Sequence, residues 1–373
     1  MCDLCGADSN VGQPKSGVGR RSVLAAAAAT PALVALSSAA KADAKPRKHR
    51  SHLELVLLGT KAGPPIDPLR TGIASALVVD GSTYLIDCGR SAATQYLHAG
   101  LTLKSMRGIF LTHLHADHIA DYYNFFLLGG SVPNQEGDSM PDVVPVYGPG
   151  SAGGLPPTFG GGSSPTVDPS NPTPGIADLT KSCDDAYAYS SNVFMRDMGI
   201  RDIRDLADVH EIQVPNVGAT YQNTAPEMDP FVVMQDENVK VSAILVPHGP
   251  VFPSFAFRFD TKYGSVTFSG DTTYTPNIPR LAHRSDVLVH EAINVQGWSG
   301  GTPVFVDHLL QSHVEVQEVG PIAQKSQVRH LVLSHISDLR GNPLPVPQWR
   351  KWARAGYNGK VTVGEDLQRF VIA

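Results

Sequence analysis

Segment 113–118 reads His-Leu-His-Ala-Asp-His and gathers three imidazoles and one carboxylate directly after a short apolar run. In extended backbone, side chains two residues apart point the same way, so His113 and His115 can bind one metal ion. If the chain then turns into a helix, Asp117 and His118 can face a second ion. Because neutral imidazole suits zinc, the segment predicts a metal centre at the end of a strand.

This segment resembles the His-x-His-x-Asp-His signature of the metallo-β-lactamase superfamily. Three later segments resemble further motifs of that family in the same order: Val-Pro-His-Gly at His248, Ser-Gly-Asp-Thr at Asp271 and Leu-Ser-His at His335. The resemblance covers most of the chain after residue 44. It implies an α/β (α+β) fold with four layers, αββα, and two Zn²⁺ ions per chain. It further implies that one zinc is held by His113, His115 and His248, that the other is held by Asp117, His118 and His335, and that Asp271 bridges them.

A finer resemblance is to the ribonuclease Z and arylsulfatase branch. It rests on Leu-Ile-Asp-Cys-Gly at Asp87, on His-Glu-Ala at His290, and on His313, which precedes His335 by 22 residues. The branch implies that His290 is the first candidate proton donor and His313 the second, with Asp117 also a candidate catalytic residue. His313 is followed by Val-Glu rather than Ser-Thr, and His308 competes for the same role.

The resemblance implies hydrolysis of phosphate or sulfate esters of a small molecule by attack of a metal-bridging hydroxide. The interval from His248 to Asp271 is only 23 positions and has no room for the protruding arm with which ribonuclease Z enzymes clamp transfer RNA. Residues 149–176 contain no Lys or Arg, and the formal charge of the chain is −5. A phosphate-tracking surface needs clustered basic residues, so these features argue against a nucleic-acid partner.

Several other functions stay open. On the same scaffold the chain could be a ribonuclease Z-like endonuclease, a lactonase or other carboxylic-ester hydrolase, or an iron-dependent redox protein. From another class, it could be a non-catalytic exported metal-binding module. An open metal position argues for catalysis over simple binding. The oligomeric state is also open, with a homodimer as one option.

The elements that must position these residues follow from the apolar pattern. A chain that is 42% hydrophobic and 17% charged can fold around a sizeable core. Short apolar runs predict strands, and amphipathic runs predict helices at 92–101, 178–189, 192–206 and 314–325. The Gly- and Pro-rich residues 149–176 predict a loop that either covers the site or lies idle on the surface, within a loop-rich insertion at about 149–235. The aromatic run 122–126 either lines a substrate pocket or packs in the core. Strands are predicted at 53–59, 76–80, 82–87, 108–112, 143–147, 239–246, 254–260, 265–269, 287–290, 331–334, 361–364 and 369–372.

Residues 1–44 have the pattern of an export signal. Arg20 and Arg21 precede an alanine-rich apolar stretch, and the segment Ser-Ser-Ala-Ala-Lys-Ala-Asp-Ala with its possible cleavage sites follows at 37–44. This order is typical of a twin-arginine signal peptide, so we expect a periplasmic or secreted protein whose hydrolase domain spans residues 45–373. The apolar stretch is shorter than the ~20 residues that a membrane span needs, so we expect no stable membrane association after cleavage. Residues 1–42 carry four basic and two acidic side chains, which leaves a charge of −7 on the rest.

Overall fold

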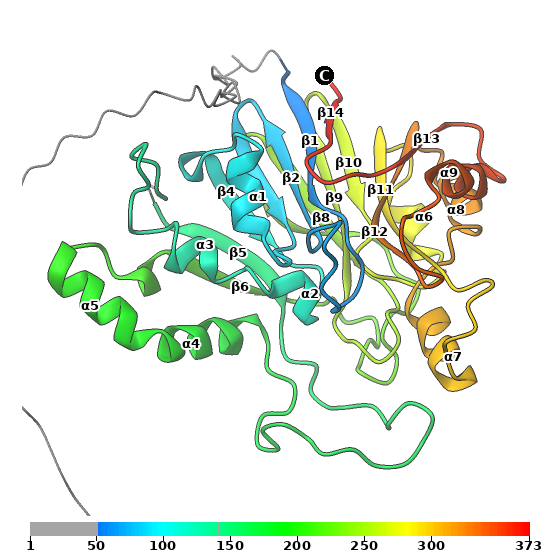
Figure 1. Ribbon diagram of the computed structural model, residues 1–373, viewed down its shortest axis with the longest axis horizontal. Coiled ribbons are helices and arrows are strands. Elements are labelled where there is room, and N and C mark those ends of the chain that lie inside the picture. The colour runs from blue at the N-terminus through cyan, green and yellow to red at the C-terminus, as the bar shows by residue number, and fades with distance from the viewer. Residues whose placement is uncertain (1–50, 141) are drawn as a thin grey trace, which may run out of the picture. The chain divides into compact units, whose positions relative to one another are not determined.

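The computed structural model describes residues 51–140 and 142–373. The predicted signal peptide at residues 1–44 lies outside these residues. Figure 1 shows that the described strands form two sheets packed against each other. Each sheet has seven strands. The first sheet has the order β14-β1-β2-β3-β4-β5-β6 and the second the order β13-β12-β11-β10-β9-β8-β7.

The strands of the first sheet are β1 (Leu53–Gly59), β2 (Ala74–Val79), β3 (Ser82–Ile86), β4 (Met106–Phe110), β5 (Val144–Pro149), β6 (Ala207–Ile212) and β14 (Arg369–Val371). Those of the second sheet are β7 (Phe231–Gln235), β8 (Val239–Leu245), β9 (Phe255–Thr261), β10 (Gly264–Phe268), β11 (Val287–Asn294), β12 (His330–Asp338) and β13 (Lys360–Val363). The α-helices are α1 (Ala92–His98), α2 (Ala116–Ile119), α3 (Asn124–Leu127), α4 (Ile176–Ala186), α5 (Ala188–Met198), α6 (Asn277–Leu281), α7 (Pro303–Ser312), α8 (Val319–Ser326) and α9 (Val346–Arg354).

Strand β1 shows why the chain folds into layers. All of its residues are buried, and alternate side chains enter different cores. Leu53 and Leu55 pack between the two sheets with Phe257 and Phe259 of β9. Val56 and Leu58 face the opposite way and pack with Tyr96 of α1. A strand that is apolar on both faces needs a cover on both faces, and this arrangement supplies it.

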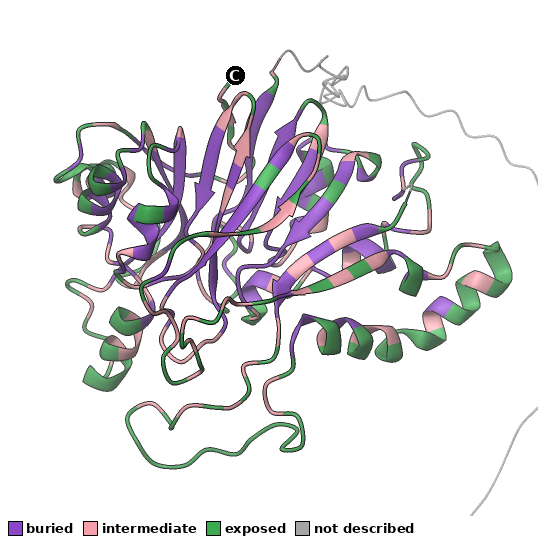
Figure 2. Cartoon of the chain, turned by 180° about the vertical axis from the view of Figure 1, so that it is seen from behind, coloured by how far each residue is buried: buried purple, intermediate pink, exposed green. Residues whose placement is uncertain are grey.

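The second sheet is covered in the same way on its outer face. Helices α6 and α8 contact its strands, and α9 packs on β13. Trp349 of α9 is fully buried there, as is Ala353 one turn later. The order helix, sheet, sheet, helix confirms the predicted αββα fold (Figure 2).

The chain segments that follow the strand ends bring the polar residues together. Strands β3, β4 and β5 pair in parallel, as do β10, β11, β12 and β13, so their carboxyl ends lie at the same edge. The segment 113–118 follows β4, His248 follows β8, and Asp271 follows β10. Residues distant in sequence therefore converge at one edge of the sandwich.

Several sequence-based expectations need correction. The helix predicted at 192–206 ends at Met198, because Gly199 adopts a left-handed conformation (φ 60°) that caps it. The predicted helix at 314–325 begins only at Val319, and strands β6 and β7 and helices α7 and α9 were not expected. For the run 122–126, where pocket and core were both open, Tyr122, Phe125 and Phe126 are buried in the core beside the first sheet.

Other observations bear on the remaining expectations. The interval between His248 and Asp271 is filled by β9 and β10, which form a hairpin and no protruding arm. Cys88 and Cys183 are both free thiols. Within residues 51–140 and 142–373, no helix is long and apolar enough to cross a membrane.

Candidate metal centre

The structure brings all seven predicted ligands to one place. Ring nitrogens of His113, His115 and His248 form one group, and side-chain atoms of Asp117, His118 and His335 form another. In each group the potential ligand atoms lie within 4.8 Å of one another. This grouping is the one that the family resemblance implies, although the ligand roles themselves stay predictions.

Asp271 lies between the two groups. Its Oδ2 atom is close to an Nε2 atom of four histidines: 3.1 Å for His335, 3.4 Å for His118, 3.7 Å for His248 and 3.9 Å for His113. The side chain of Asp271 is almost fully buried. A single carboxylate thus faces both groups, which is the geometry that a bridging ligand requires.

Buried atoms without partners indicate that a cation fits here. Nε2 of His113, Nε2 of His118 and Oδ1 of Asp271 are buried and have no hydrogen-bond partner. Buried polar atoms are normally paired, so unpaired atoms that point into one cluster of nitrogen and oxygen donors need an explanation. A set of imidazoles and carboxylates is the donor type that zinc prefers, so the residues present fit the predicted metal.

Local backbone geometry orients the first four ligands. After β4 the chain stays extended through His115 (φ −67°, ψ 146°), which is the N-cap of α2. The short helix then turns Asp117 and His118 into the site, and the His118 N–H donates to the carbonyl of His115 at 2.9 Å. The expected change from strand to helix inside the motif is confirmed.

His335 reaches the site through an irregularity in β12. Ser334 pairs with Glu291 of β11, but the next pair joins Ile336 to Ala292, so His335 is an extra residue between them. Its φ is 46°, in the left-handed region that non-glycine residues rarely adopt. A β-bulge of this kind redirects a side chain, and the strain is held at the ligand position itself.

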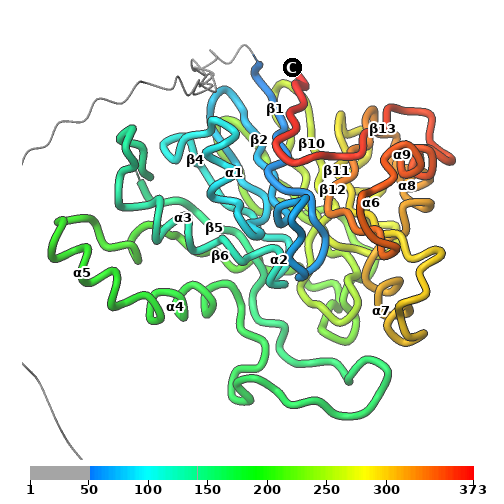
Figure 3. The backbone as a smooth tube through the Cα atoms, viewed as in Figure 1, coloured from blue at the N-terminus to red at the C-terminus, as the bar shows by residue number. Residues whose placement is uncertain are grey.

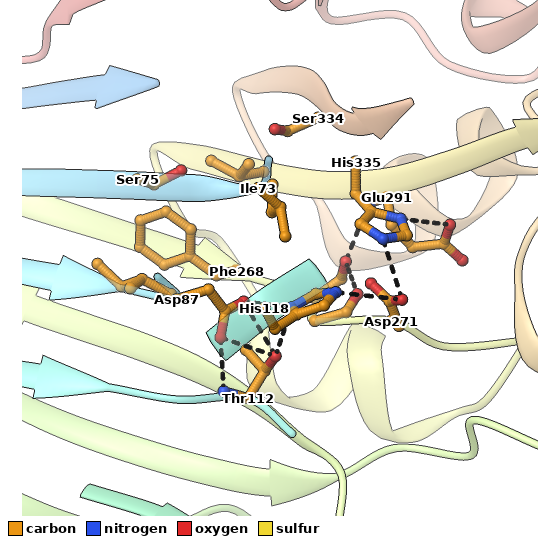
Figure 4. Close-up of a pocket in the computed structure, with 14 residues that line it drawn as sticks. Ile73, Ser75, Asp87, Thr112, His118, Phe268, Asp271, Glu291, Ser334 and His335 are labelled. Atoms are coloured by element: carbon orange, nitrogen blue, oxygen red, sulfur yellow. Dashed lines mark hydrogen bonds and ion pairs between the residues drawn. The ribbon is translucent and has the colours of Figure 1, made fainter. Parts of the chain in front are cut away.

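Hydrogen bonds from a second layer of residues hold the imidazoles (Figure 4). Asp87 Oδ2 lies 2.9 Å from Nδ1 of His118, and Asp87 Oδ1 accepts a hydrogen bond from the Thr112 N–H at 2.8 Å. Nδ1 of His248 lies 2.8 Å from the carbonyl oxygen of Ser312. Such contacts at one ring nitrogen leave the other free for a metal. Asp87 therefore supports a candidate ligand and is not itself one of the seven.

Burial and neighbouring carboxylates shift the pKa values of the clustered histidines in opposite directions. Burial lowers the pKa of His113, and it lowers that of His248 to about 3. Burial also acts to lower the pKa of His335, but the charge of Asp271 and the hydrogen bond to Asp117 raise it to about 9. Burial likewise opposes protonation of His118, yet Asp271 and Asp87 raise its pKa. In the metal-free protein, His118 and His335 are therefore protonated. Their positive charges offset the negative charges of the buried carboxylates.

The three other candidate histidines, His290, His308 and His313, lie in different surroundings. Nδ1 of His313 is 3.3 Å from Glu291 Oε2 and 3.9 Å from Asp271 Oδ2, so His313 borders the cluster. His290 is fully buried, and its Nδ1 is 2.6 Å from the carbonyl of Glu291. Adjacent strand residues point to opposite faces, so the structure brings Glu291 to the metal centre and does not bring His290 there. His308 packs against Phe159, with ring centroids 4.9 Å apart.

Sequence reasoning missed some supporting groups. The Gly63 N–H donates to Asp117 Oδ2 at 2.9 Å, and the Thr112 hydroxyl lies 3.1 Å from Nδ1 of His113. Thr112 was detectable as the residue that precedes the motif. The contributions of Gly63 and Ser312 come from their backbones, which no residue type reveals.

Comparisons with known proteins agree with the fold. A profile of the metallo-beta-lactamase superfamily matches residues 69–127, which include segment 113–118. The chain is 28% identical over 319 residues to a ribonuclease Z of Mycobacterium bovis, covering 85% of this chain and 97% of that protein. It is 27% identical, with the same coverage, to a ribonuclease Z of Mycobacterium tuberculosis.

Solved structures of similar fold cover most of the chain. Human tRNase Z, short form, aligns with a TM-score of 0.58 and 20% identity over 86% of this chain and 99% of that one. The metallo-beta-lactamase fold protein YhfI from Bacillus subtilis aligns with a TM-score of 0.54 and 15% identity over 85% and 98%. At these identities the likeness shows the fold alone.

The fold, the cluster of imidazoles and carboxylates and the profile match together define a metal-dependent hydrolase that acts on ester bonds. Residues 69–127 are similar to the metallo-β-lactamase superfamily, and the described residues share the fold of the solved metallo-β-lactamase-fold protein.

Proposed function

We propose that this hydrolase is a phosphodiesterase that uses two zinc ions. The position of Asp271 carries the proposal, because its Oδ2 lies within 3.9 Å of ring nitrogens from both ligand groups. When bound, two such ions supply Lewis acidity and an activated water near neutral pH. The residues that would hold them are His113, His115 and His248 on one side, Asp117, His118 and His335 on the other, and Asp271 between.

His313 is placed to give a proton to the leaving oxygen. Its side chain is 13% exposed, whereas Glu291 beside it is 1% exposed, so the imidazole is the member of the pair that a substrate can reach. The other oxygen of Glu291 accepts a hydrogen bond from the Val314 N–H at 2.7 Å. This bond fixes the carboxylate, which then orients the His313 ring.

His290, the first candidate from the sequence, is less well placed for this step. It is fully buried on the opposite face of β11, and its Nδ1 already has a partner in the Glu291 carbonyl. We therefore propose His313 as the proton donor and Glu291 as its positioning residue.

RNA is the first substrate class to test. The support is that curated relatives covering 85% of this chain are named ribonuclease Z. The second candidate is a small aryl phosphate or sulfate. It is favoured by the plain β9–β10 hairpin between His248 and Asp271 and by the absence of Lys and Arg from residues 149–176.

The experiment compares four substrates with the zinc-loaded full chain: an RNA with a 3′ extension, bis(p-nitrophenyl) phosphate, p-nitrophenyl sulfate and a lactone. We expect both phosphodiesters to be cleaved, activity to be lost with a chelator, and about two zinc ions per chain by elemental analysis. Cleavage of the sulfate or the lactone alone would overturn the phosphodiesterase proposal. Cleavage of the small diester without the RNA would favour the second candidate.

Export is a separate proposal that rests on the sequence of residues 1–44. We expect the full chain in the periplasmic fraction of a bacterial host that has twin-arginine export. Replacing Arg20 and Arg21 together by Lys should retain it in the cytoplasm. Equal distribution of both proteins would contradict the proposal.

A further inference from the structure

A cavity of about 630 Å³ opens beside the metal centre. His115, a predicted ligand, forms part of its wall. The rest of the wall comes from the end of β5, from the loop 149–176 and from residues 250–253, which follow the ligand His248. Figure 3 shows this loop as a long excursion of the backbone between β5 and α4. A group attached to an ester bound at the metals can therefore extend directly into the cavity.

The lining of this cavity has an unusual chemistry for a phosphodiesterase. It contains no Lys, Arg, Asp or Glu, and eight of its residues are prolines. Phe159 and Phe252 add two aromatic rings, and Leu155 and Val251 add aliphatic surface. A charged group would lose hydration here without gaining a partner. A flat uncharged ring, by contrast, can pack on the faces of proline and phenylalanine rings.

Contacts with α7 and at its base hold the loop 149–176 in place as one wall of the cavity. Gly160 approaches Val304 of α7 so closely that a Cβ atom on Gly160 would lie 2.7 Å from Val304 Cγ1. The neighbouring Phe159 packs edge-on against His308 of the same helix. At the base of the loop, the hydroxyls of Ser151 and Thr173 are 3.2 Å apart. The loop thus leaves the first sheet, contacts α7 on the side of the second sheet, and returns.

From these observations we infer that the cavity is a specificity pocket for an aromatic ring on the group that stays attached to the phosphate when the leaving group departs. The ring is a nucleobase or a simple aryl group, which share the same flat, uncharged surface. The phosphate stays at the metal centre, and the ring enters the space between Phe159 and the proline-rich wall. The inference rests on the proposed phosphodiesterase function, whose substrate class it narrows.

The test uses three diesters that share p-nitrophenolate as leaving group. Their other substituent is ethyl, phenyl or the 5′ position of thymidine. With the zinc-loaded full chain, we expect kcat/KM for the phenyl or thymidine ester to exceed that for the ethyl ester by about tenfold, the range of a single stacking contact. Replacing Phe159 by Ala should bring this ratio close to one. Leu155→Asp should also bring this ratio close to one, because it places a charge in the uncharged wall of the cavity.

The control variant is Phe194→Ala, because Phe194 is a partly exposed aromatic residue on α5 that does not line the cavity. It should retain the full ratio. A gain for the thymidine ester alone would identify the ring as a nucleobase, and equal gains would indicate any aromatic ring. Equal kcat/KM for all three esters would overturn the pocket while leaving the phosphodiesterase standing.

A binding measurement separates the two proposals if no ester is cleaved. Calorimetry with the zinc-loaded protein compares phenylphosphonate with methylphosphonate. Tighter binding of the phenyl compound, lost in Phe159→Ala, would support the pocket even if the phosphodiesterase proposal fails. Equal affinities would reject the pocket.

Discussion

Glu291 Oε2 lies 3.3 Å from Nδ1 of His313, and the same ring nitrogen lies 3.9 Å from Oδ2 of Asp271. Burial acts to raise the pKa of Glu291, but His313 and His335 lower it, so the carboxylate stays ionised. An ionised, fixed carboxylate beside a partly exposed imidazole is suited to hold a proton at the ring until the leaving oxygen takes it.

Replacing His313 by Ala should therefore affect substrates according to their leaving groups. We expect the turnover of a diester with an alkoxide leaving group to fall by ~10²–10⁴-fold. A p-nitrophenolate ester, whose leaving group needs no proton, should lose much less. Steady-state kinetics on the two esters, with zinc content measured in parallel, provide the test. His283→Ala is the matched control, because His283 is an exposed histidine away from the cluster. Equal losses on both esters would exclude His313 as the donor.

The buried His290 gives the opposite expectation. Because it lies on the far face of β11, His290→Ala should lower the stability of the protein while the activity of the folded fraction changes little. Thermal unfolding and the rate per folded molecule separate these effects. A rate loss that is confined to poor leaving groups would instead restore His290 as the proton donor.

Asp87 should control metal affinity without touching the metal. Asp87→Asn weakens its 2.9 Å contact with His118, so we expect zinc affinity to fall by ~10–100-fold in a competition titration with a chromogenic chelator. Asp138→Asn is the matched control. Asp138 is also buried and also accepts backbone hydrogen bonds, from Leu103 and Lys104, but it is absent from the cluster. If both variants weaken zinc binding equally, the effect comes from general destabilisation.

The cluster of candidate metal ligands was predictable because most of its residues lie in short segments. Segment 113–118 carries four of them within six positions, and strand alternation followed by a helical turn directs their side chains to one place. The apolar runs likewise indicate most strands of the two sheets. Strand β6 was missed because only Ile212 of its six residues is buried, so the strand has no apolar run.

The choice between His290 and His313 could not be made from the sequence. It depends on which face of β11 meets the cluster, and that is set by the pairing of β11 with β10 and β12. The left-handed bulge at His335 is equally invisible, since histidine has no strong preference for it. For the loop 149–176, the composition predicts irregular structure but not the course of the backbone. Its contacts with α7 are therefore known only from the structure.

Metal binding should release protons. The pKa of His335 is raised to about 9 and that of His118 is also raised, so both rings are protonated at pH 7 in the metal-free protein. Zinc binds only the neutral imidazole, so these protons must leave. The apparent zinc affinity should therefore increase with pH up to about 9. Calorimetry at pH 7 in buffers of different ionisation enthalpy measures the number of protons released when zinc binds. A binding enthalpy that is independent of the buffer would contradict this picture.

Gly270 should be needed for the position of Asp271. Its φ is +58°, and a Cβ atom there would lie 2.5 Å from the carbonyl oxygen of Phe255 and 3.2 Å from Cβ of Thr112. Gly270→Ala therefore combines a left-handed conformation, which costs ~1–2 kcal/mol for a residue with a side chain, with a clash against backbone. Relief of that clash must move the neighbouring Asp271 or Thr112, so both stability and zinc affinity should fall.

Gly81→Ala separates the two contributions to this effect. Gly81 also has a positive φ, +86°, but a Cβ atom there would meet nothing within 4 Å. It lies in the turn between β2 and β3, at the other end of β3 from Asp87. We expect Gly81→Ala to lower the free energy of unfolding and to leave zinc affinity unchanged. If Gly270→Ala behaves in the same way, Asp271 tolerates the displacement, and the bridging position does not depend on the tight turn that precedes it.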